Sequence, residues 1–97
     1  MNLALKEAEK ALEHDDVPVG AVMVYEGTII AKIHNQVELL KDPTAHAEIF
    51  AITQAANTLK RKRLEHATMY VTLEPCPMCV GAIVLARVEN LYYGTHD

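Results

Sequence analysis

The sequence predicts an α/β fold, a three-layer α/β/α sandwich in which a mixed β-sheet lies between helices. Three features carry this prediction: a valine-rich hairpin near the N-terminus, two later strands, and an apolar helical segment before each of those strands. A hairpin pairs antiparallel, whereas strands joined through a helix pair in parallel. A sheet that contains both is therefore mixed.

The first predicted element is an amphipathic helix. Leu5, Ala8 and Leu12 recur at helical spacing, with Ala4 and Ala11 beside them, and we expect this face to contact the core. A proline shortly afterwards ends the helical pattern, since proline cannot continue a helix.

A β-hairpin follows this helix. Residues 17–25 are rich in valine and residues 28–33 in isoleucine, as strands commonly are. Glu26–Gly27 lies between them and is typical of a tight hairpin turn. The polar residues 35–41 are predicted to form a loop.

The second helix is predicted to start at Asp42–Pro43, because proline is tolerated in the first turn of a helix. The basic run Lys60 to Arg63 ends it. Its apolar residues recur at spacings of three and four, which predicts a buried stripe. This stripe consists of Ala45, Ile49, Ile52, Ala56 and Leu59.

The remaining chain predicts a strand, a helix and a last strand. Residues 69–73 alternate in character as a strand does, and Pro75 stops that strand. Residues 77–86 are mostly apolar, which predicts a buried helix. Residues 88–93 are expected to pair in parallel with the strand at 69–73.

Length and composition indicate one domain over residues 1–97 and exclude a two-domain enzyme. The net charge of −4 is unlike that of proteins that bind nucleic acid through phosphate contacts alone. Any nucleic acid must therefore be held by a local patch and a pocket. No apolar stretch is long enough to cross a membrane, and no signal or transit peptide is recognisable. We expect a cytoplasmic protein.

The two cysteines are the first chemical signal. Cys76 and Cys79 are separated by two residues, a spacing typical of a metal pair or a redox pair in a reducing compartment. If Pro77 is the first helical residue, both sulfurs lie at the N-terminal end of that helix. The unpaired N–H groups and the dipole at this end stabilise thiolates.

His46 and Glu48 are the second signal, at the start of the preceding helix. Side chains two residues apart on a helix of ~3.6 residues per turn are rotated about 200° from each other around the helix axis. The two side chains can therefore meet at one point only beyond the helix end. Two helix N-termini that meet at one edge of the sheet supply such a point, and α/β proteins place their sites there.

One imidazole and two thiolates, from His46, Cys76 and Cys79, are good zinc ligands. A structural zinc site usually has four protein ligands, so three leave a position for a water whose pKa zinc lowers towards ~7. Glu48 is then the candidate general acid and base for attack of hydroxide on an electrophilic carbon. A Cys-x-x-Cys pair at a helix start also occurs in thioredoxin-like redox proteins, but the upstream His46 and Glu48 favour zinc.

The motif His46–Ala47–Glu48 followed by Pro75–Cys76–Pro77–Met78–Cys79 resembles the signature of the zinc-dependent nucleoside and nucleobase deaminases. Nearly the whole chain resembles one branch of them, the bacterial tRNA adenosine deaminases. Guanine deaminases share much of residues 74–83, and Thr72–Leu73–Glu74 favours the tRNA branch. Other segments that carry the resemblance are 17–22, 34–35, 42–48, 81–83, Arg87 and 93–94.

The resemblance implies a cytidine-deaminase-like fold, a homodimer, and one zinc ion per chain held by His46, Cys76 and Cys79. It implies that Glu48 is the proton shuttle. The implied hydrolysis converts adenosine to inosine at the wobble position of a tRNA anticodon loop and releases ammonia. The target base must be splayed out of its loop to enter the pocket.

The resemblance also implies substrate contacts. Asn35 matches an asparagine that hydrogen-bonds the purine, a role that suits an amide able to donate and accept. Val19 and Ala47 match residues that line the pocket, and Asp97 matches an acidic residue near the ribose.

The chain departs from this family at three places. Lys62 stands where a bulky residue is usual, and Ile33 stands where glycine is usual. The family continues beyond the position of Asp97 with another strand and with C-terminal helices that help to grip RNA, so we expect these elements to be missing. A deaminase of free bases or nucleosides, such as guanine deaminase, and an inactive zinc-binding fragment stay open as alternatives. The run Lys60 to Arg63 is either a phosphate contact or a solvated helix end.

Overall fold

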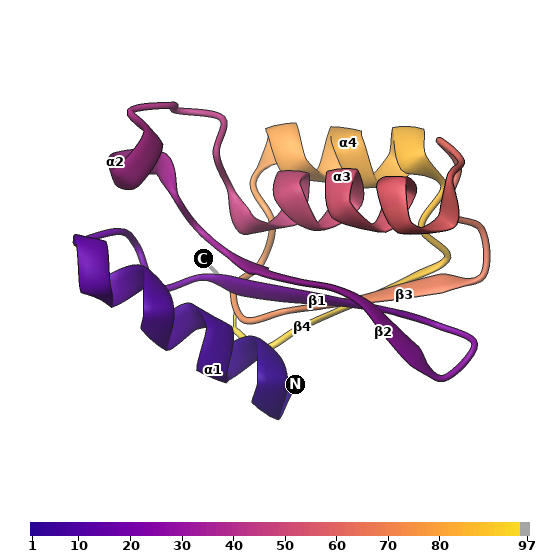
Figure 1. The fold of residues 1–97 in the computed structure, drawn as a ribbon, viewed down its shortest axis with the longest axis horizontal. Helices are drawn as coiled ribbons and strands as arrows, with labels where there is room; N and C mark the ends of the chain where they lie inside the picture. Colours follow the sequence, from indigo (N-terminus) through magenta and orange to yellow (C-terminus); the bar gives the residue numbers. More distant parts are fainter. Residues whose placement is uncertain (96–97) are drawn as a thin grey trace.

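The computed structural model describes residues 1–95, and Asp97 lies outside them. Four strands form one sheet in the order β2-β1-β3-β4 (Figure 1). β1 pairs antiparallel with both β2 and β3, and β3 pairs in parallel with β4, so the predicted mixed sheet is confirmed. The strands are β1 Gly20–Tyr25, β2 Thr28–His34, β3 Ala67–Val71 and β4 Asn90–Tyr93.

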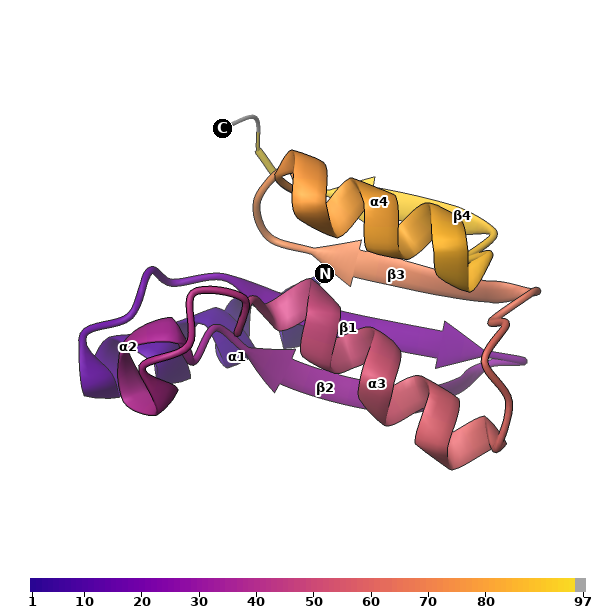
Figure 2. The same cartoon turned by 90° about the horizontal axis from the view of Figure 1, so that it is seen from above.

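Helices cover both faces of this sheet, which confirms the three-layer sandwich. α1 (Asn2–Ala11) lies on one face, and α3 (Ala47–Leu59) and α4 (Pro77–Ala86) lie on the other (Figures 1 and 2). A 3₁₀ helix (Leu12–His14) continues α1, and a single turn, α2 (Val37–Leu40), follows β2. None of the helices in residues 1–95 has the length and apolar character needed to cross a membrane.

The hairpin forms where the sequence predicts it. Glu26 and Gly27 have φ values of +50° and +77°, the left-handed conformation that both central residues of a type I′ turn require. The register shifts between Met23 and Val24, which leaves Ile30 without a residue directly opposite and adds local twist.

The predicted loop at 35–41 is wrong, because it contains α2. The predicted start of the next helix is also wrong, since α3 begins at Ala47 with His46 as its N-cap. Asp42 forms a turn instead, in which its Oδ1 accepts hydrogen bonds from the backbone N–H and the hydroxyl of Thr44 at 2.8 and 2.7 Å. A carboxylate before a threonine can satisfy a turn as well as a helix start, and here the turn is adopted.

The helices approach the sheet through small side chains. On α1 these are the predicted alanines, whereas the leucines predicted beside them do not face the core. Leu5 of α1 and Leu12 of the following 3₁₀ helix are exposed. Ile52 and Leu59 of α3 pack only at the margin of the core. The fully buried line on α3 was not predicted. The sheet-facing residues are Ala4, Ala8 and Ala11 on α1, and Ala47, Ala51 and Ala55 on α3.

α4 spans the predicted residues, but it is not a buried helix. Its sheet-facing residues, Ile83 and Ala86, are buried, whereas Val84 is 66% exposed and Leu85 is 82% exposed. α4 covers the β3–β4 side of the sheet, with α3 as its helical neighbour (Figure 2). An apolar composition could not show that one side of this helix has no neighbour within residues 1–95. β3 also ends two residues before its predicted end, at Val71.

Gly20 sets the distance between α1 and β1. A Cβ at this position would overlap the carbonyl oxygen of Ala4 and would lie 2.6 Å from the backbone nitrogen of Ala8. The backbone of β1 therefore touches the backbone of α1, which explains why alanine and not leucine faces the sheet from α1.

Glu7 joins α1 to the end of β2. Its carboxylate accepts hydrogen bonds from Lys10 Nζ at 2.8 Å and from His34 Nδ1 at 3.2 Å. Burial opposes ionisation of Glu7, but these hydrogen bonds and charges outweigh it and hold the pKa of the carboxyl below its ordinary value. His34 precedes Asn35, so this link positions a predicted substrate residue.

We expect Gly20→Ala to lower the free energy of unfolding by about 3 kcal/mol or more, because no rotamer relieves an overlap with backbone. Gly81→Ala is the control. Gly81 lies within α4 with no atom within 4 Å of an added Cβ, so alanine there should stabilise by roughly 0.5–1 kcal/mol. Urea unfolding of both variants measures the difference, and equal stabilities would contradict the close approach.

We expect Glu7→Gln to lower the free energy of unfolding at pH 7 by about 1–3 kcal/mol, the contribution of a hydrogen-bonded buried charge. The folded pKa lies below the ordinary value of 4.5, so this contribution is complete above pH 4.5 and is lost as the pH falls through the folded pKa. Urea unfolding at several pH values measures it. Glu9→Gln, on the exposed side of α1, should show no such dependence, and a Glu7 effect that does not change with pH would refute the assignment.

Candidate active site

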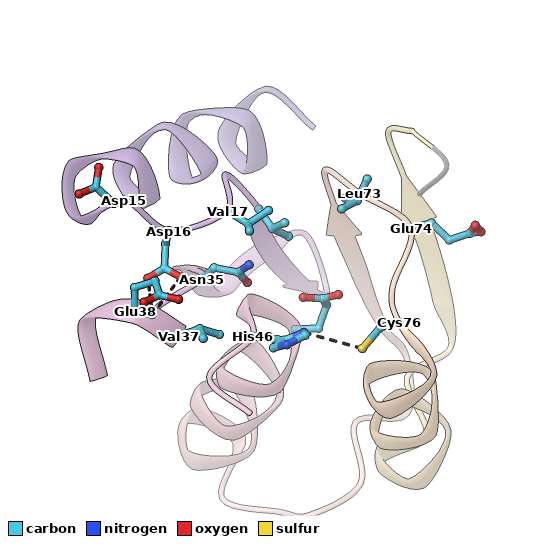
Figure 3. A pocket seen from close by; sticks show the side chains of 12 residues that line it. Asp15, Asp16, Val17, Asn35, Val37, Glu38, His46, Leu73, Glu74 and Cys76 are labelled. Atoms are coloured by element: carbon cyan, nitrogen blue, oxygen red, sulfur yellow. Dashed lines mark hydrogen bonds between the residues drawn. The ribbon is translucent and has the colours of Figure 1, made fainter. Parts of the chain in front are cut away.

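The N-termini of α3 and α4 meet at one edge of the sheet. His46 is the N-cap of α3 and Cys76 is the N-cap of α4, and both have extended backbone conformations. His46 Nδ1 lies 3.7 Å from Cys76 Sγ (Figure 3). The same nitrogen lies 3.5 Å from Cys79 Sγ. The structure thus brings together the three residues predicted from the sequence to bind a metal.

These three donors fit a zinc ion. Their ligand atoms all lie within 4.8 Å of one another. Zinc holds nitrogen at ~2.0–2.1 Å and sulfur at ~2.3 Å, so tetrahedral ligands of these two kinds lie roughly 3.6 Å apart. The observed N···S distances of 3.5 and 3.7 Å agree with that separation.

The Cys79 thiol shows why the cluster suits a cation. Burial raises its pKa strongly, and the neighbouring charge of Glu48 and the Cys76 sulfur raise it further. Without a cation the thiol therefore stays protonated. A metal ion in contact with the sulfur reverses this balance, because a coordinating thiol loses its proton outright.

Glu48 lies in the first turn of α3 and is only 3% exposed. Burial raises the pKa of its carboxyl, while its own backbone N–H, His46 and Cys79 partly offset the increase. Oε1 is buried and has no hydrogen-bond partner within the described chain. A buried oxygen without a partner is costly, so this atom indicates a ligand or water that the protein is built to receive.

A cavity of about 360 Å³ opens onto these groups, large enough for a small molecule or a single base (Figure 3). Four of its lining residues are apolar: Val17, Val19, Val37 and Leu73. Five are acidic: Asp15, Asp16, Glu38, Glu48 and Glu74. The remainder are Asn35, His46 and Cys76.

Asn35 is buried and held on two sides. Its backbone N–H donates to the Val19 carbonyl at 3.0 Å, and its Oδ1 accepts from the Ala47 N–H at 2.7 Å. The side-chain oxygen is therefore used to satisfy the first N–H of α3. The amide NH₂ group remains for a ligand, so Asn35 is a donor here.

Asp16 was missed by the sequence analysis, although it shapes the cavity. Both of its carboxylate oxygens accept from the Glu38 N–H at 3.1 Å, and Oδ2 also accepts from the Leu39 N–H and contacts His14 Nδ1. Asp16 thereby satisfies the N-terminal N–H groups of α2 from a distant segment. Because these groups belong to a helix that the sequence did not predict, no local signal could identify this role.

The other predicted substrate contacts differ in position. Val19 is buried and lines the cavity. Ala47 is fully buried within the core and is not among the lining residues, although its N–H holds Asn35. Asp97 lies outside the described residues, so its role stays a prediction.

Residues 1–97 match the MafB19-like deaminase family. The chain is 54% identical to the tRNA-specific adenosine deaminases of Aquifex aeolicus and Bacillus subtilis over 97 residues. The alignments include all of this chain but only 64% and 60% of those two proteins. The chain therefore spans less than two thirds of their length.

Two solved structures extend the comparison. One comes from a study of A-to-I editing by tRNA:A34 deaminases at the wobble position of transfer RNA. It is 52% identical with a TM-score of 0.97 and covers 100% of this chain and 70% of that one. The other is guanine deaminase from Bacillus subtilis, which is 39% identical with a TM-score of 0.93 and covers 98% of this chain and 61% of that one.

Proposed function

The chain belongs to the MafB19-like deaminase family, and on this premise we propose that it is the zinc-binding core of a tRNA-specific adenosine deaminase. The observation that carries the proposal is the cluster of His46, Cys76 and Cys79 beside the buried Glu48 carboxylate, whose Oε1 has no hydrogen-bond partner within residues 1–95. The proposed reaction converts adenosine to inosine at the wobble position, and we propose a cytoplasmic location.

His46, Cys76 and Cys79 would hold one zinc ion per chain, in agreement with their spacing. When bound, zinc supplies a Lewis acid that lowers the pKa of a bound water towards ~7. Three protein ligands leave the position that such a water needs.

Glu48 moves the proton. Hydrolysis forms a bond between the purine C6 and the oxygen of water, and it breaks the bond from C6 to the amino group. The Glu48 carboxylate takes a proton from the water and delivers it to the leaving nitrogen, which departs as ammonia. A pKa raised by burial suits a group that must both accept and donate near neutral pH.

Asn35 and the apolar walls hold the base. The Asn35 NH₂ group donates to a purine acceptor, while Val19, Val37 and Leu73 contact the ring faces. A cavity of this size admits one base, so the target nucleotide must leave its stack. Asp97 remains the proposed contact to the ribose.

Deamination of a free base is the second candidate. The observation that favours it is the similarity of the chain to guanine deaminase, at a TM-score of 0.93. The greater identity to tRNA-specific enzymes, 54% against 39%, favours the tRNA substrate.

We further propose that the protein forms a homodimer. The outer side of α4 is apolar and solvent-exposed in the isolated chain, with Val80 43%, Val84 66% and Leu85 82% exposed. Pairing this face with the same face of a second chain removes apolar surface from water. Each Å² buried in this way contributes roughly 25 cal/mol to the free energy of association.

Glu48→Gln should lower the rate of inosine formation by about 10²- to 10⁴-fold, the usual contribution of a general acid and base. Zinc content should remain near one ion per chain. The measurements are metal analysis and inosine formation in an anticodon stem-loop. Glu38→Gln, an exposed carboxylate at the rim of the same cavity, is the matched control and should retain nearly full activity.

Other outcomes identify the alternatives. Ammonia release from free guanine without inosine in the stem-loop would identify a guanine deaminase. Zinc binding without either reaction would identify an inactive zinc-binding fragment, and a purified chain without zinc would refute the metal site.

Light scattering should give the mass of two 10.8 kDa chains for the parent protein. Val84→Glu places a charge on the apolar side of α4 and should give monomers, because a buried unpaired charge is costly. Leu12→Glu changes an exposed leucine of the 3₁₀ helix after α1 and should leave the dimer intact. A monomeric parent chain would overturn the proposed dimer.

A further inference from the structure

The positive charge of this chain is concentrated at one place. Five of its nine lysines and arginines lie in the run Lys60 to Arg63 and at Arg87, although the net charge is −4. All five are exposed. These five residues are called the basic end below.

The fold brings the two parts of the basic end together. α3 and α4 lie on the same face of the sheet, and their C-termini point to the same side of the molecule (Figures 1 and 2). The Leu64 N–H donates to the Ala86 carbonyl at 2.6 Å, which fixes the segment after α3 against the end of α4. Lys62, Arg63 and Arg87 then surround one surface hollow.

The fold itself uses only one of these five side chains. Arg61 lies 5.1 Å above the Tyr25 ring and donates to the Glu65 carbonyl at 3.2 Å. Within residues 1–95, the side chains of Lys60, Lys62, Arg63 and Arg87 form no ion pair or hydrogen bond.

Neighbouring charges leave this region positive. Glu65 and Glu89 border the adjacent surface beside Arg87, and Glu89 lies 3.5 Å from His66. Two carboxylates do not balance five cations. The negative ends of two helix dipoles account for about half a charge each, so roughly two of the five positive charges have no counter-charge within residues 1–95.

The candidate active site has the opposite charge. Five carboxylates line its cavity, and neither lysine nor arginine lines it. A phosphate backbone gains no attraction from such a lining. A nucleic acid whose base occupies the cavity must therefore be attracted by cations elsewhere.

We propose that the basic end binds the phosphate backbone of the RNA whose target base occupies the cavity. The proposal rests on the proposed function in taking RNA as the substrate. α3 has 13 residues and so separates the basic end from the metal cluster by ~20 Å. The basic end thus contacts nucleotides away from the target base, and it supplies affinity and orientation without selecting sequence.

The cationic rim is compatible with a dimer through α4. Lys62, Arg63 and Arg87 line one hollow together with Val84 and Leu85, so the three cations border the apolar side of α4. Interfaces commonly have an apolar centre and a polar rim that stays in water.

The test measures binding of a labelled anticodon stem-loop by fluorescence anisotropy at several salt concentrations. Lys62→Gln with Arg63→Gln should reduce the slope of log K against log salt by roughly 1.4–1.8, the loss of two phosphate contacts. Affinity at 0.1 M salt should fall on the order of 25- to 60-fold. An unrelated RNA hairpin of equal length should lose affinity similarly.

Lys6→Gln with Lys32→Gln is the matched control. It removes two exposed cations that do not belong to the basic end, and it changes the net charge by the same amount. It should leave the slope unchanged. Equal losses in both double variants, no binding by the parent chain, or equally effective competition by polyglutamate would overturn the proposal. Thermal midpoints and zinc content establish that the variants remain folded.

The proposal and the proposed function can fail separately. If no inosine forms but the Lys62/Arg63 variant has a reduced salt slope, the proposed function fails while RNA binding by the basic end is supported. If inosine forms with the same KM in parent and variant, RNA binding by the basic end is refuted while the proposed function is supported.

Discussion

The meeting of two helix N-termini at one sheet edge is the constraint on which the rest of this structure depends. α3 and α4 each lead into a strand, and both lie on the same face of the sheet, so their N-termini reach the same edge. His46 and Cys76 are the cap residues of these helices. The donors of the metal cluster therefore converge because of topology, although they lie about thirty residues apart in the chain.

Small residues let the layers of the fold approach one another closely. Gly20 allows β1 to touch α1, and a line of alanines allows α3 to lie close to the sheet. The Asn35 side chain then joins the end of β2 to the first N–H of α3. The oxygen of this amide thus stabilises the fold, while its NH₂ group remains available to a ligand.

The molecule separates its charges along the helices. Carboxylates surround the cavity at the N-terminal ends of α3 and α4, and cations gather beyond their C-terminal ends. An acidic cavity favours a metal cation, whereas a cationic surface at the opposite end favours an anion. This separation is how the proposed RNA binding is reconciled with an overall acidic chain.

The sequence by itself determined the class of fold and the chemistry of the site, because these depend on local signals. Glu26–Gly27 specifies its turn through backbone conformation alone, and Pro77 marks the start of α4. The spacing of His46, Glu48, Cys76 and Cys79 likewise indicated a metal-dependent hydrolase. Only the tertiary structure decided which apolar residues are buried, why Asp16 matters, and that Asn35 is left as a donor. Burial and hydrogen-bond partners depend on which surfaces face one another across the fold, and the periodicity of one segment does not contain that information.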